Sequence, residues 1–305
     1  MKQSKSALCV LLAGTLWGSM GLFVRKLNAV GLYALDIVQL RIAISLVLVG
    51  LYLLIFARDK LRVRLRDLWC FAGTGIVSLL LFSWCYFSGM QEASLSVMAV
   101  LLYTSPAFIV LLSVLLFRET LTRQKLLALV LTFAGCCLVS GLGSGSAVSM
   151  KGLLLGLGSG FFYALYSIFS RYAIERGYGS WTITFYTFLF CLLASAPLAH
   201  WGLIAQALSS DASVPVYALL MGLLTGFLAY IFYTKGLEGM ESSRAGILAS
   251  VEPVVGTIME RSFSTSRCLF KASSASRWFW AELSFWAAKK SPKRKLFLNT
   301  STHFL

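Results

Sequence analysis

Long apolar runs separated by short charged islands constrain this sequence more than any other feature. Nine such runs can be marked: 7–24, 36–57, 68–89, 94–117, 126–143, 152–172, 181–201, 216–236 and 243–259. A helix needs about 20 apolar residues to cross the hydrocarbon of a bilayer, and only the last run is marginally short. The runs do not alternate as barrel strands do, and lipid requires every backbone group to be paired. The sequence therefore predicts an all-α integral membrane protein with about nine spanning helices.

Composition excludes several other classes of protein. Only 13% of the residues are charged, about half the share of a soluble domain, and no charged island is long enough to form one. The net charge of +15 does not indicate a nucleic-acid partner, because more than half of the excess lies in residues 261–305. Six of the seven cysteines fall inside apolar runs and no CxxC occurs, so we expect neither disulfides nor a metal site.

Lys and Arg are unevenly distributed between alternate loops. With the N-terminus in the cytoplasm, the cytoplasmic segments up to residue 259 carry fourteen Lys and Arg, and the outer segments carry only Arg25, Lys26 and Lys151. Positive residues accumulate in cytoplasmic loops. The pattern predicts a multi-pass protein of the cytoplasmic membrane with a cytoplasmic N-terminus, whose first run, 7–24, is a retained helix rather than a signal peptide.

The chain also repeats itself. A shift of 146–147 residues places Gly14 on Gly160, Phe23 on Phe169, Gly89 on Gly236 and Pro106 on Pro253. The first unit, 7–143, has five predicted helices, and an odd number makes the second unit enter the membrane from the opposite face. Inverted repeats of this kind are found in secondary transporters, whose substrate sites lie between the repeats near the midplane.

Three segments resemble one transporter family. LAGTLWGSMGLFVRKL (12–27), LLYTSPAFIVLLSVLLFRETLT (101–122) and ILASVEPVVGTIM (247–259) look like the EamA family of the drug/metabolite transporter superfamily. The resemblance implies ten helices in two inverted five-helix repeats, here a first repeat over 7–143 and an incomplete second repeat over 152–259. It implies a carrier of small metabolites or drugs, such as amino acids, that works outward across the cytoplasmic membrane. The sequence does not decide whether the protein forms a homodimer.

The middle of the ninth run contains an unusual pair, Glu252 and Pro253. A carboxylate at this depth is costly in lipid, so it should face a cavity, meet a cation or be protonated. Its uses would be to bind a substrate amine or to couple transport to protons. Alternatively, it pairs backbone donors freed by Pro253. Pro106 is the matching residue in the first repeat, and each proline should interrupt its helix, either as a hinge or cavity wall or as plain packing geometry.

Other candidate cavity residues lie at depth in several runs. Arg41, in the second run, either extends to the interface or forms a counter-ion site in the cavity. Aromatic rings with a polar atom suit the recognition of amphipathic solutes, although they also fill cores. The remaining candidates are Trp17, Ser19, Tyr103, Tyr163 and Tyr166.

Motifs for catalysis or cofactor binding are missing. No GxxxxGK[ST] occurs, and GLGSG around Ser159 does not fit a nucleophile motif. His200 and His303 are the only histidines and have no evident partner. We therefore predict neither an enzyme nor a bound cofactor, and partners limited to a small-molecule substrate, membrane lipid and, as a candidate coupling ion, the proton. The basic loop 58–67 is either a topology signal or a contact with anionic lipid.

The last segment, 260–305, departs from the repeat. Its longest apolar stretch, 278–288, is about 11 residues and contains Glu282, which is too short to span. Nine helices would also place its nine Lys and Arg on the outer side, against the bias elsewhere. We interpret this tail as a frameshifted or aberrant segment replacing a tenth helix, with a basic tail on the membrane surface as the alternative.

Together these features predict a secondary carrier for a small organic solute, working by alternating access around a midplane cavity. The alternative is a membrane protein that does not transport, either a truncated remnant or a helix-bundle partner of another protein. The missing tenth helix favours this alternative, whereas the aromatic and polar residues at depth favour the carrier.

Overall fold

The computed structural model describes residues 3–139 and 149–263, and every regular element in these ranges is helical. Within these two ranges, seven helices are long and apolar enough to cross a membrane: Gln3–Asn28, Ala34–Phe56, Leu65–Gly89, Val97–Phe117, Met150–Glu175, Ser180–Leu198 and Ser213–Glu238. They correspond to seven of the nine predicted runs. The other two runs are also helical, over Arg123–Val139 and over Ser242–Phe263 with a break. The total of nine or ten spans stays a prediction, and residues 264–305 of the tail lie outside the described residues.

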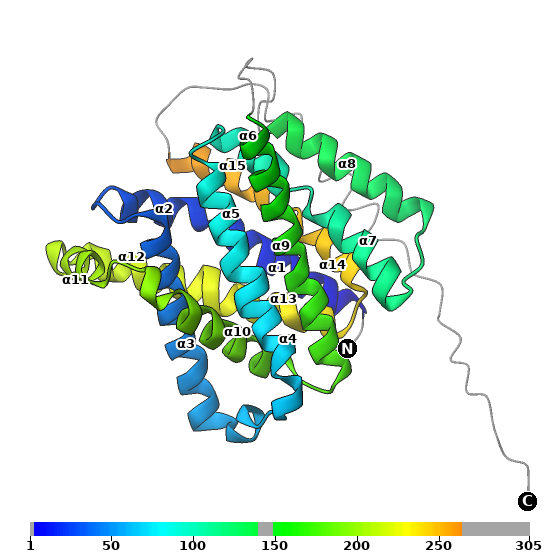
Figure 1. The fold of residues 1–305 in the computed structure, drawn as a ribbon, viewed down its shortest axis with the longest axis horizontal. Coiled ribbons are helices and arrows are strands. Elements are labelled where there is room, and N and C mark those ends of the chain that lie inside the picture. The colour runs from blue at the N-terminus through cyan, green and yellow to red at the C-terminus, as the bar shows by residue number, and fades with distance from the viewer. Residues whose placement is uncertain (1–2, 140–148, 264–305) are drawn as a thin grey trace, which may run out of the picture.

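The helices follow one another in two series (Figure 1). The first contains α1 (Gln3–Gly18), α2 (Met20–Asn28), α3 (Ala34–Phe56), α4 (Leu68–Ala72), η3 (Gly73–Leu80), α5 (Leu81–Gly89), α6 (Leu95–Leu102), α7 (Ser105–Phe117) and α8 (Arg123–Val139). The second contains α9 (Met150–Glu175), α10 (Ser180–Ser195), α11 (Trp201–Ser210), α12 (Ser213–Met221), η5 (Gly222–Leu228), α13 (Ala229–Glu238), α14 (Ser242–Ala249) and α15 (Glu252–Phe263). Single 3-10 turns precede α4 (η1, Arg58–Leu61; η2, Leu65–Asp67) and follow α10 (η4, Ala196–Leu198). Only α11 has no separate counterpart among the predicted runs.

Packing relates the two series to each other. The first helix of each series lies along the third helix of the other: α1 along α13, and α9 along η3 and α5 (Figure 1). Likewise α3 packs on η5 and α10 on η3. These reciprocal contacts are what a pseudo-twofold arrangement of two repeats produces.

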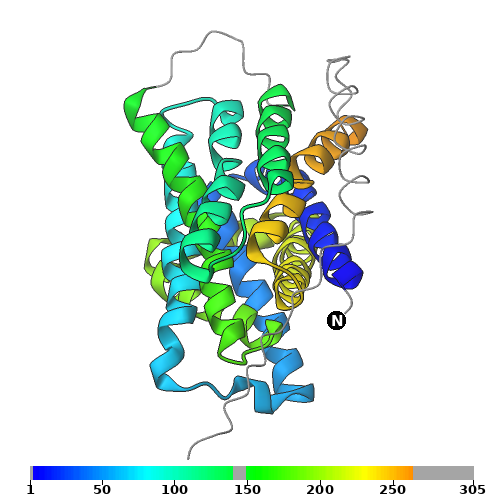
Figure 2. The same ribbon diagram turned by 90° about the vertical axis from the view of Figure 1, so that its right-hand side faces the viewer.

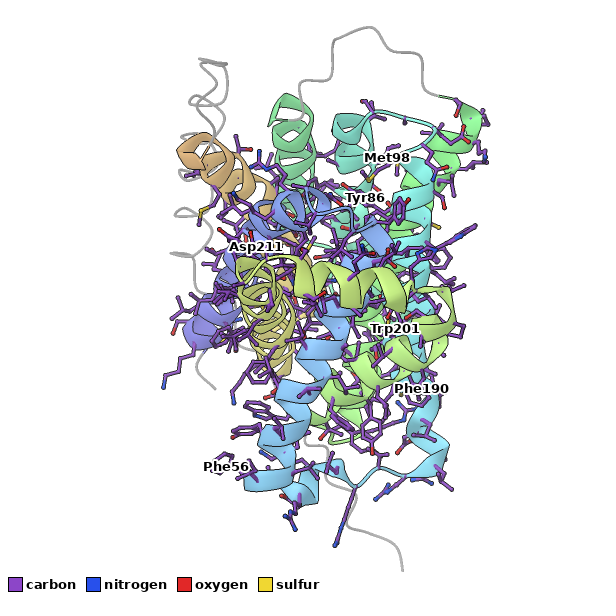
Figure 3. All side chains as sticks on the ribbon, turned by 90° about the vertical axis from the view of Figure 1, so that its left-hand side faces the viewer. Phe56, Tyr86, Met98, Phe190, Trp201 and Asp211 are labelled. Atoms are coloured by element: carbon purple, nitrogen blue, oxygen red, sulfur yellow. The ribbon has the colours of Figure 1, made fainter. Side chains whose placement is uncertain are left out.

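The turns of the bundle gather at two opposite faces. On the face where α1 begins, which we call the N-terminal face, the turns are joined by hydrogen bonds such as Arg64 N to the Tyr178 hydroxyl (3.1 Å). On the opposite face, Lys151 at the start of α9 pairs with Glu92 in the α5–α6 turn (2.6 Å). Figure 2 shows α5 and α9 running between the two faces, and Figure 3 labels Phe56 toward the first and Tyr86 toward the second. The two series thus start at opposite faces.

Two breaks occupy matching places in the fourth predicted helix of each repeat. One separates α6 from α7 at Tyr103 and Thr104, and the other separates α14 from α15 at residues 250–251. Pro106 and Pro253 are each the second residue of the helix that follows the break. A proline is tolerated there because the first-turn N–H groups have no intrahelical partner.

Glycines allow the first helix of each repeat to approach the break in the other. A Cβ on Gly18 of α1 would lie 2.6 Å from the Glu252 carbonyl oxygen, and one on Gly160 of α9 would lie 2.6 Å from the Thr104 hydroxyl. Small residues at helix contacts permit such close approach in a membrane, where there is no hydrophobic force between helices. These glycines therefore let the two broken helices pack directly against α1 and α9.

Candidate functional site

A cavity of about 440 Å³ lies between the two repeats, on the side of the opposite face. Its lining comes from the α1–α2 helix, α3, α5, α6, α9, α12, α13 and α15. It extends to Arg25, Asn28 and Met90 at the helix ends of the opposite face. A volume in this range accommodates a small organic molecule.

The structure brings five of the nine predicted site residues to this cavity: Trp17, Arg41, Tyr103, Tyr163 and Glu252. Tyr166 lies deeper, behind them. Ser19, Pro106 and Pro253 do not belong to the cavity lining. The role of each residue in binding stays a prediction.

Glu252 begins α15, directly after the break, and its half-buried side chain faces the cavity. Within residues 3–139 and 149–263, no hydrogen bond or ion pair engages its carboxylate. The alternative in which Glu252 pairs donors freed by Pro253 does not occur here, because the N–H groups of Val254 and Val255 both donate to the Val251 carbonyl. The carboxylate is thus available to a cation or to a solute.

Arg41 is one of two arginines that line the cavity, and the other, Arg25, lies at the opposite face. The side chain of Arg41 is 6% exposed and donates to the Met20 sulfur at 3.0 Å, so it does not extend to the interface. Arg41 and Glu252 line the same cavity. The α3 backbone that holds Arg41 lies beside the Ser45 hydroxyl, whose single proton is within hydrogen-bond distance of both the Arg41 carbonyl (2.7 Å) and the Gly222 carbonyl of η5 (2.8 Å).

An aromatic cluster, formed by Trp17, Tyr163, Tyr166, Tyr230 and Tyr233, closes the cavity toward the N-terminal face. The Trp17 ring lies 5.2–6.3 Å from three of the tyrosine rings, in edge or tilted contact. Hydroxyl pairs lock the deeper rings in place: Tyr166 with Thr234 (2.8 Å) and Tyr233 with Ser167 (2.7 Å). The space left within the cluster is about 10 Å³, about the volume of one water. No solute can pass this cluster in the conformation described.

Trp17 owes its position to a π-helical segment. The indole N–H donates to the carbonyl of Thr225 at 3.1 Å, within η5. A π-helix forms hydrogen bonds between residues five apart, one more than in an α-helix, and it often occurs at functional sites. The first repeat has a π-helical segment, η3, at the corresponding place.

Besides Tyr166, three predicted residues lie outside the cavity lining, and they shape the backbone around it. The Ser19 hydroxyl donates to the Leu16 carbonyl at 2.7 Å, where α1 ends. Pro106 and Pro253 start the new helix after each break. The depth of a residue in an apolar run does not determine whether its side chain faces the inside of the bundle.

A second barrier, the Glu119 latch, lies on the N-terminal face beyond the aromatic cluster. Glu119, in the α7–α8 turn, accepts hydrogen bonds from the N–H of Ser242 (2.9 Å) and Ser243 (3.3 Å) at the start of α14. Lys125 of α8 pairs with Glu119 (3.5 Å) and with Glu241 (2.9 Å), and both Lys125 and Glu119 are buried. The carboxylate thus caps a helix start and joins the first repeat to the second.

Arg171, at the end of α9, extends the latch. It donates to the Ser242 hydroxyl at 3.1 Å and to the Met240 carbonyl. Together with Glu119 it holds the turn before α14 from both sides. Several buried, charge-assisted bonds in one turn make this end of the bundle firmly closed.

Sequence reasoning missed Tyr86, Tyr230, Tyr233 and the partners of Glu119. Tyr230 and Tyr233 lie three residues apart and so share a helix face, which was a usable signal. That this face meets Trp17 could not be read from the sequence. Glu119 lies within the segment 101–122 that resembles the family, but its contact with Ser242 spans 123 residues and depends on how the repeats dock.

The EamA-like transporter family matches the chain twice, over residues 4–141 and 150–271. A protein of Archaeoglobus fulgidus named as an uncharacterized transporter is 29% identical over 55% of this chain and 58% of its own length. A second uncharacterized transporter of that organism is 23% identical over 83% of this chain and 88% of the relative. The uncharacterized transporter YwfM of Bacillus subtilis is 23% identical over 85% of this chain and 86% of its length.

A solved crystal structure shares the fold. It superimposes with a TM-score of 0.73 over 93% of this chain and 98% of the other, at 20% identity. The resemblance predicted from three motifs is confirmed by the double family match, which covers both predicted repeats. Taken with the apolar helices and the reciprocal packing, these matches show that the chain belongs to the EamA-like transporter family.

Proposed function

We propose that this protein is a secondary carrier that moves a small organic solute through the cavity between its two repeats. The observation that carries the proposal is the cavity itself, which contains Arg41 and Glu252, reaches one face and is blocked toward the other. A structural helix bundle has no need of an unpaired carboxylate at this depth, which lipid makes costly.

The cavity chemistry suits a solute with an acid group, an amine and an apolar part. Arg41 offers a guanidinium to a carboxylate, and Glu252 offers a carboxylate to an ammonium group. Between them the walls are aromatic and apolar, with Tyr86, Phe82 and Tyr230 among the lining. An amphipathic zwitterion, such as an amino acid with a large side chain, would satisfy both charges at once.

Alternating access follows from the two barriers. In the conformation described, the cavity reaches the opposite face, and the aromatic cluster and the Glu119 latch close the N-terminal face. Transport requires the repeats to rock so that the latch opens and the opposite face closes. With a cytoplasmic N-terminus, this is an outward-open state, from which an exporter has released its solute.

The cavity carboxylate also offers a coupling route. A proton and an ammonium group would compete for Glu252, so that a proton entering from outside displaces the solute. Exchange of one for the other would let a proton gradient drive export.

The test is flux in vesicles reconstituted with the purified protein. Labelled amino acids that range from small to aromatic are loaded inside, and counterflow is measured with and without a pH gradient. We expect saturable flux of apolar zwitterions, with the apparent KM raised at least tenfold by Arg41→Gln. The matched control is Gln206→Ala, an exposed position on α11 away from the cavity.

Two outcomes would overturn the proposal. Absence of saturable flux for any solute from a folded, monodisperse preparation would favour a membrane protein that does not transport. Flux that Arg41→Gln and Gln206→Ala leave equally intact would remove the cavity from the transport path.

A further inference from the structure

A second pocket, unrelated to the transport cavity, lies at the N-terminal face. It has a volume of about 330 Å³ and is lined by Arg64, Arg66, Asp67, Trp69 and Arg176. Arg64 directly precedes η2, Arg66 and Asp67 lie within it, Trp69 lies in the first turn of α4, and Arg176 directly follows α9. The pocket is therefore at the ends of two predicted membrane spans, the depth at which lipid headgroups lie.

The charge of this pocket is positive and incompletely compensated. Asp67 is already engaged: its carboxylate pairs with Arg176 at 3.2 Å and accepts the Tyr178 hydroxyl at 2.8 Å. The guanidinium groups of Arg64 and Arg66 make no hydrogen bond or ion pair with any residue that the structure describes. The three arginines carry more positive charge than the one carboxylate neutralises, so the pocket can attract an anion.

Arg176 is held in place as part of this pocket. Its guanidinium lies 4.9 Å from the centre of the Trp69 ring and 5.8 Å from that of Tyr172. The ion pair with Asp67 fixes its other side. Stacking and pairing together orient the planar group, so the pocket is built before any ligand arrives.

From the pocket an aromatic ridge of partly exposed rings extends along α4, α9 and α7. Trp69 is 43% exposed and contacts Phe169 (6.1 Å) and Tyr172 (5.4 Å), and Tyr172 contacts Phe117 (4.8 Å). All four rings are at least partly exposed. A free phosphate would use the arginines alone, whereas a lipid would place its headgroup on them and an acyl chain on the ridge.

We propose that this pocket binds the phosphodiester headgroup of an anionic phospholipid, with one acyl chain along the aromatic ridge. Basic pockets between membrane helices at the headgroup level recognise anionic lipids in this way. The site is independent of the transport cavity, and the bound lipid would tie η2 to the end of α9. It would thereby join the first repeat to the second at the same face as the Glu119 latch.

The experiment measures thermal unfolding of the purified protein in detergent with added lipid. The probes are phosphatidylglycerol, phosphatidylcholine and inorganic phosphate, each titrated to the same phosphate concentration. The double variant Arg64→Gln/Arg66→Gln is compared with Lys60→Gln/Arg62→Gln, which removes the same charge from the same loop outside the pocket. Native mass spectrometry of the unaltered protein counts retained lipids as a second readout.

We expect phosphatidylglycerol to raise the Tm of the parent and of the Lys60/Arg62 variant, and this rise to be lost in the Arg64/Arg66 variant. Mass spectrometry should show phosphatidylglycerol retained in preference to phosphatidylcholine. An equal rise with inorganic phosphate would make the pocket a free-anion site and overturn the lipid assignment. Equal loss in both double variants, or no effect of phosphatidylglycerol on the parent, would overturn it too.

Discussion

Glu252 directly follows the break in the ninth predicted helix. The break therefore places an ionisable side chain in the interior of the bundle. The Glu252 carboxylate lies in the same cavity as Arg41 but is not consumed by a fixed ion pair. A carboxylate in a fixed ion pair would mainly stabilise the fold. A carboxylate without such a pair can bind a proton and a solute amine in turn. A coupling role can therefore be tested by replacing this one carboxylate.

At this scale we expect Glu252→Gln to remove the pH dependence of transport. Gln keeps the shape of the side chain but cannot bind a proton in the relevant range. Counterflow in vesicles, measured at a series of pH values, should change with pH for the parent and stay constant for the variant. Unchanged pH dependence in the variant would refute coupling at this residue.

The sequence alone was informative about single residues where the physical cost is large. A glutamate in an apolar run must have a reason, and Glu252 does line a cavity. The sequence was uninformative where the cost of burying a polar group is small. Ser19, at similar depth, does not line the cavity but donates a hydrogen bond to the nearby Leu16 carbonyl. Tyr86 and Tyr230 look like ordinary core residues until the facing helices are known.

At the scale of elements, close helix approach is the basis of the central architecture. Glycines of α1 and α9 contact the breaks in α14–α15 and α6–α7, and the freed backbone groups are covered by protein rather than lipid. The existence of most helices was predictable from apolar runs. The location of the breaks was only approximate, because Pro106 and Pro253 follow each break by two residues rather than marking it.

We expect Gly18→Ala to destabilise the protein by about 1–3 kcal/mol, the usual cost of overpacking. The new Cβ would lie 2.6 Å from the Glu252 carbonyl oxygen and 2.7 Å from the Val255 Cβ. The control is Gly202→Ala in α11, where a Cβ meets nothing within 4 Å. Unfolding in detergent measures both, and equal stability of the two variants would contradict the close contact.

The latch gives a second prediction at this scale. Glu119→Gln should destabilise the protein by about 1–3 kcal/mol, because it leaves the buried Lys125 with less compensation. Glu241→Gln removes a partner of the same lysine, but Glu241 is 44% exposed, so its effect should be about 0–1 kcal/mol. Denaturant unfolding of the pair compares them directly, and the reverse order of stabilities would show that the latch depends on Glu241.

The whole molecule is defined by two repeats that start at opposite faces. The repeat was visible in the sequence as a shift of 146–147 residues, and the odd helix number implied inversion. The sequence could not show how the two repeats pack against each other. The contact of α1 with α13, for example, joins residues more than two hundred positions apart. Contacts of that range depend on side-chain fit across the interface, which no local pattern encodes.

Orientation can be tested by labelling in intact cells. We expect Gln91→Cys, in the α5–α6 turn, to react with a membrane-impermeant maleimide from outside. Gly239→Cys, between α13 and α14, should react only after the membrane is opened. The parent chain reports the background of the native cysteines. Labelling of both positions from the same side would contradict the inverted arrangement, and exchanged sides would reverse the predicted orientation.

The two π-helical segments, η3 and η5, bear on how the third helix of each repeat can deform. Each segment lies within that helix and packs against helices of the other repeat. Helices kink preferentially at π-helical turns, and such turns are frequent at functional sites. The third helix of each repeat can therefore bend at the point where it contacts the other repeat, without unwinding the helical segments on either side.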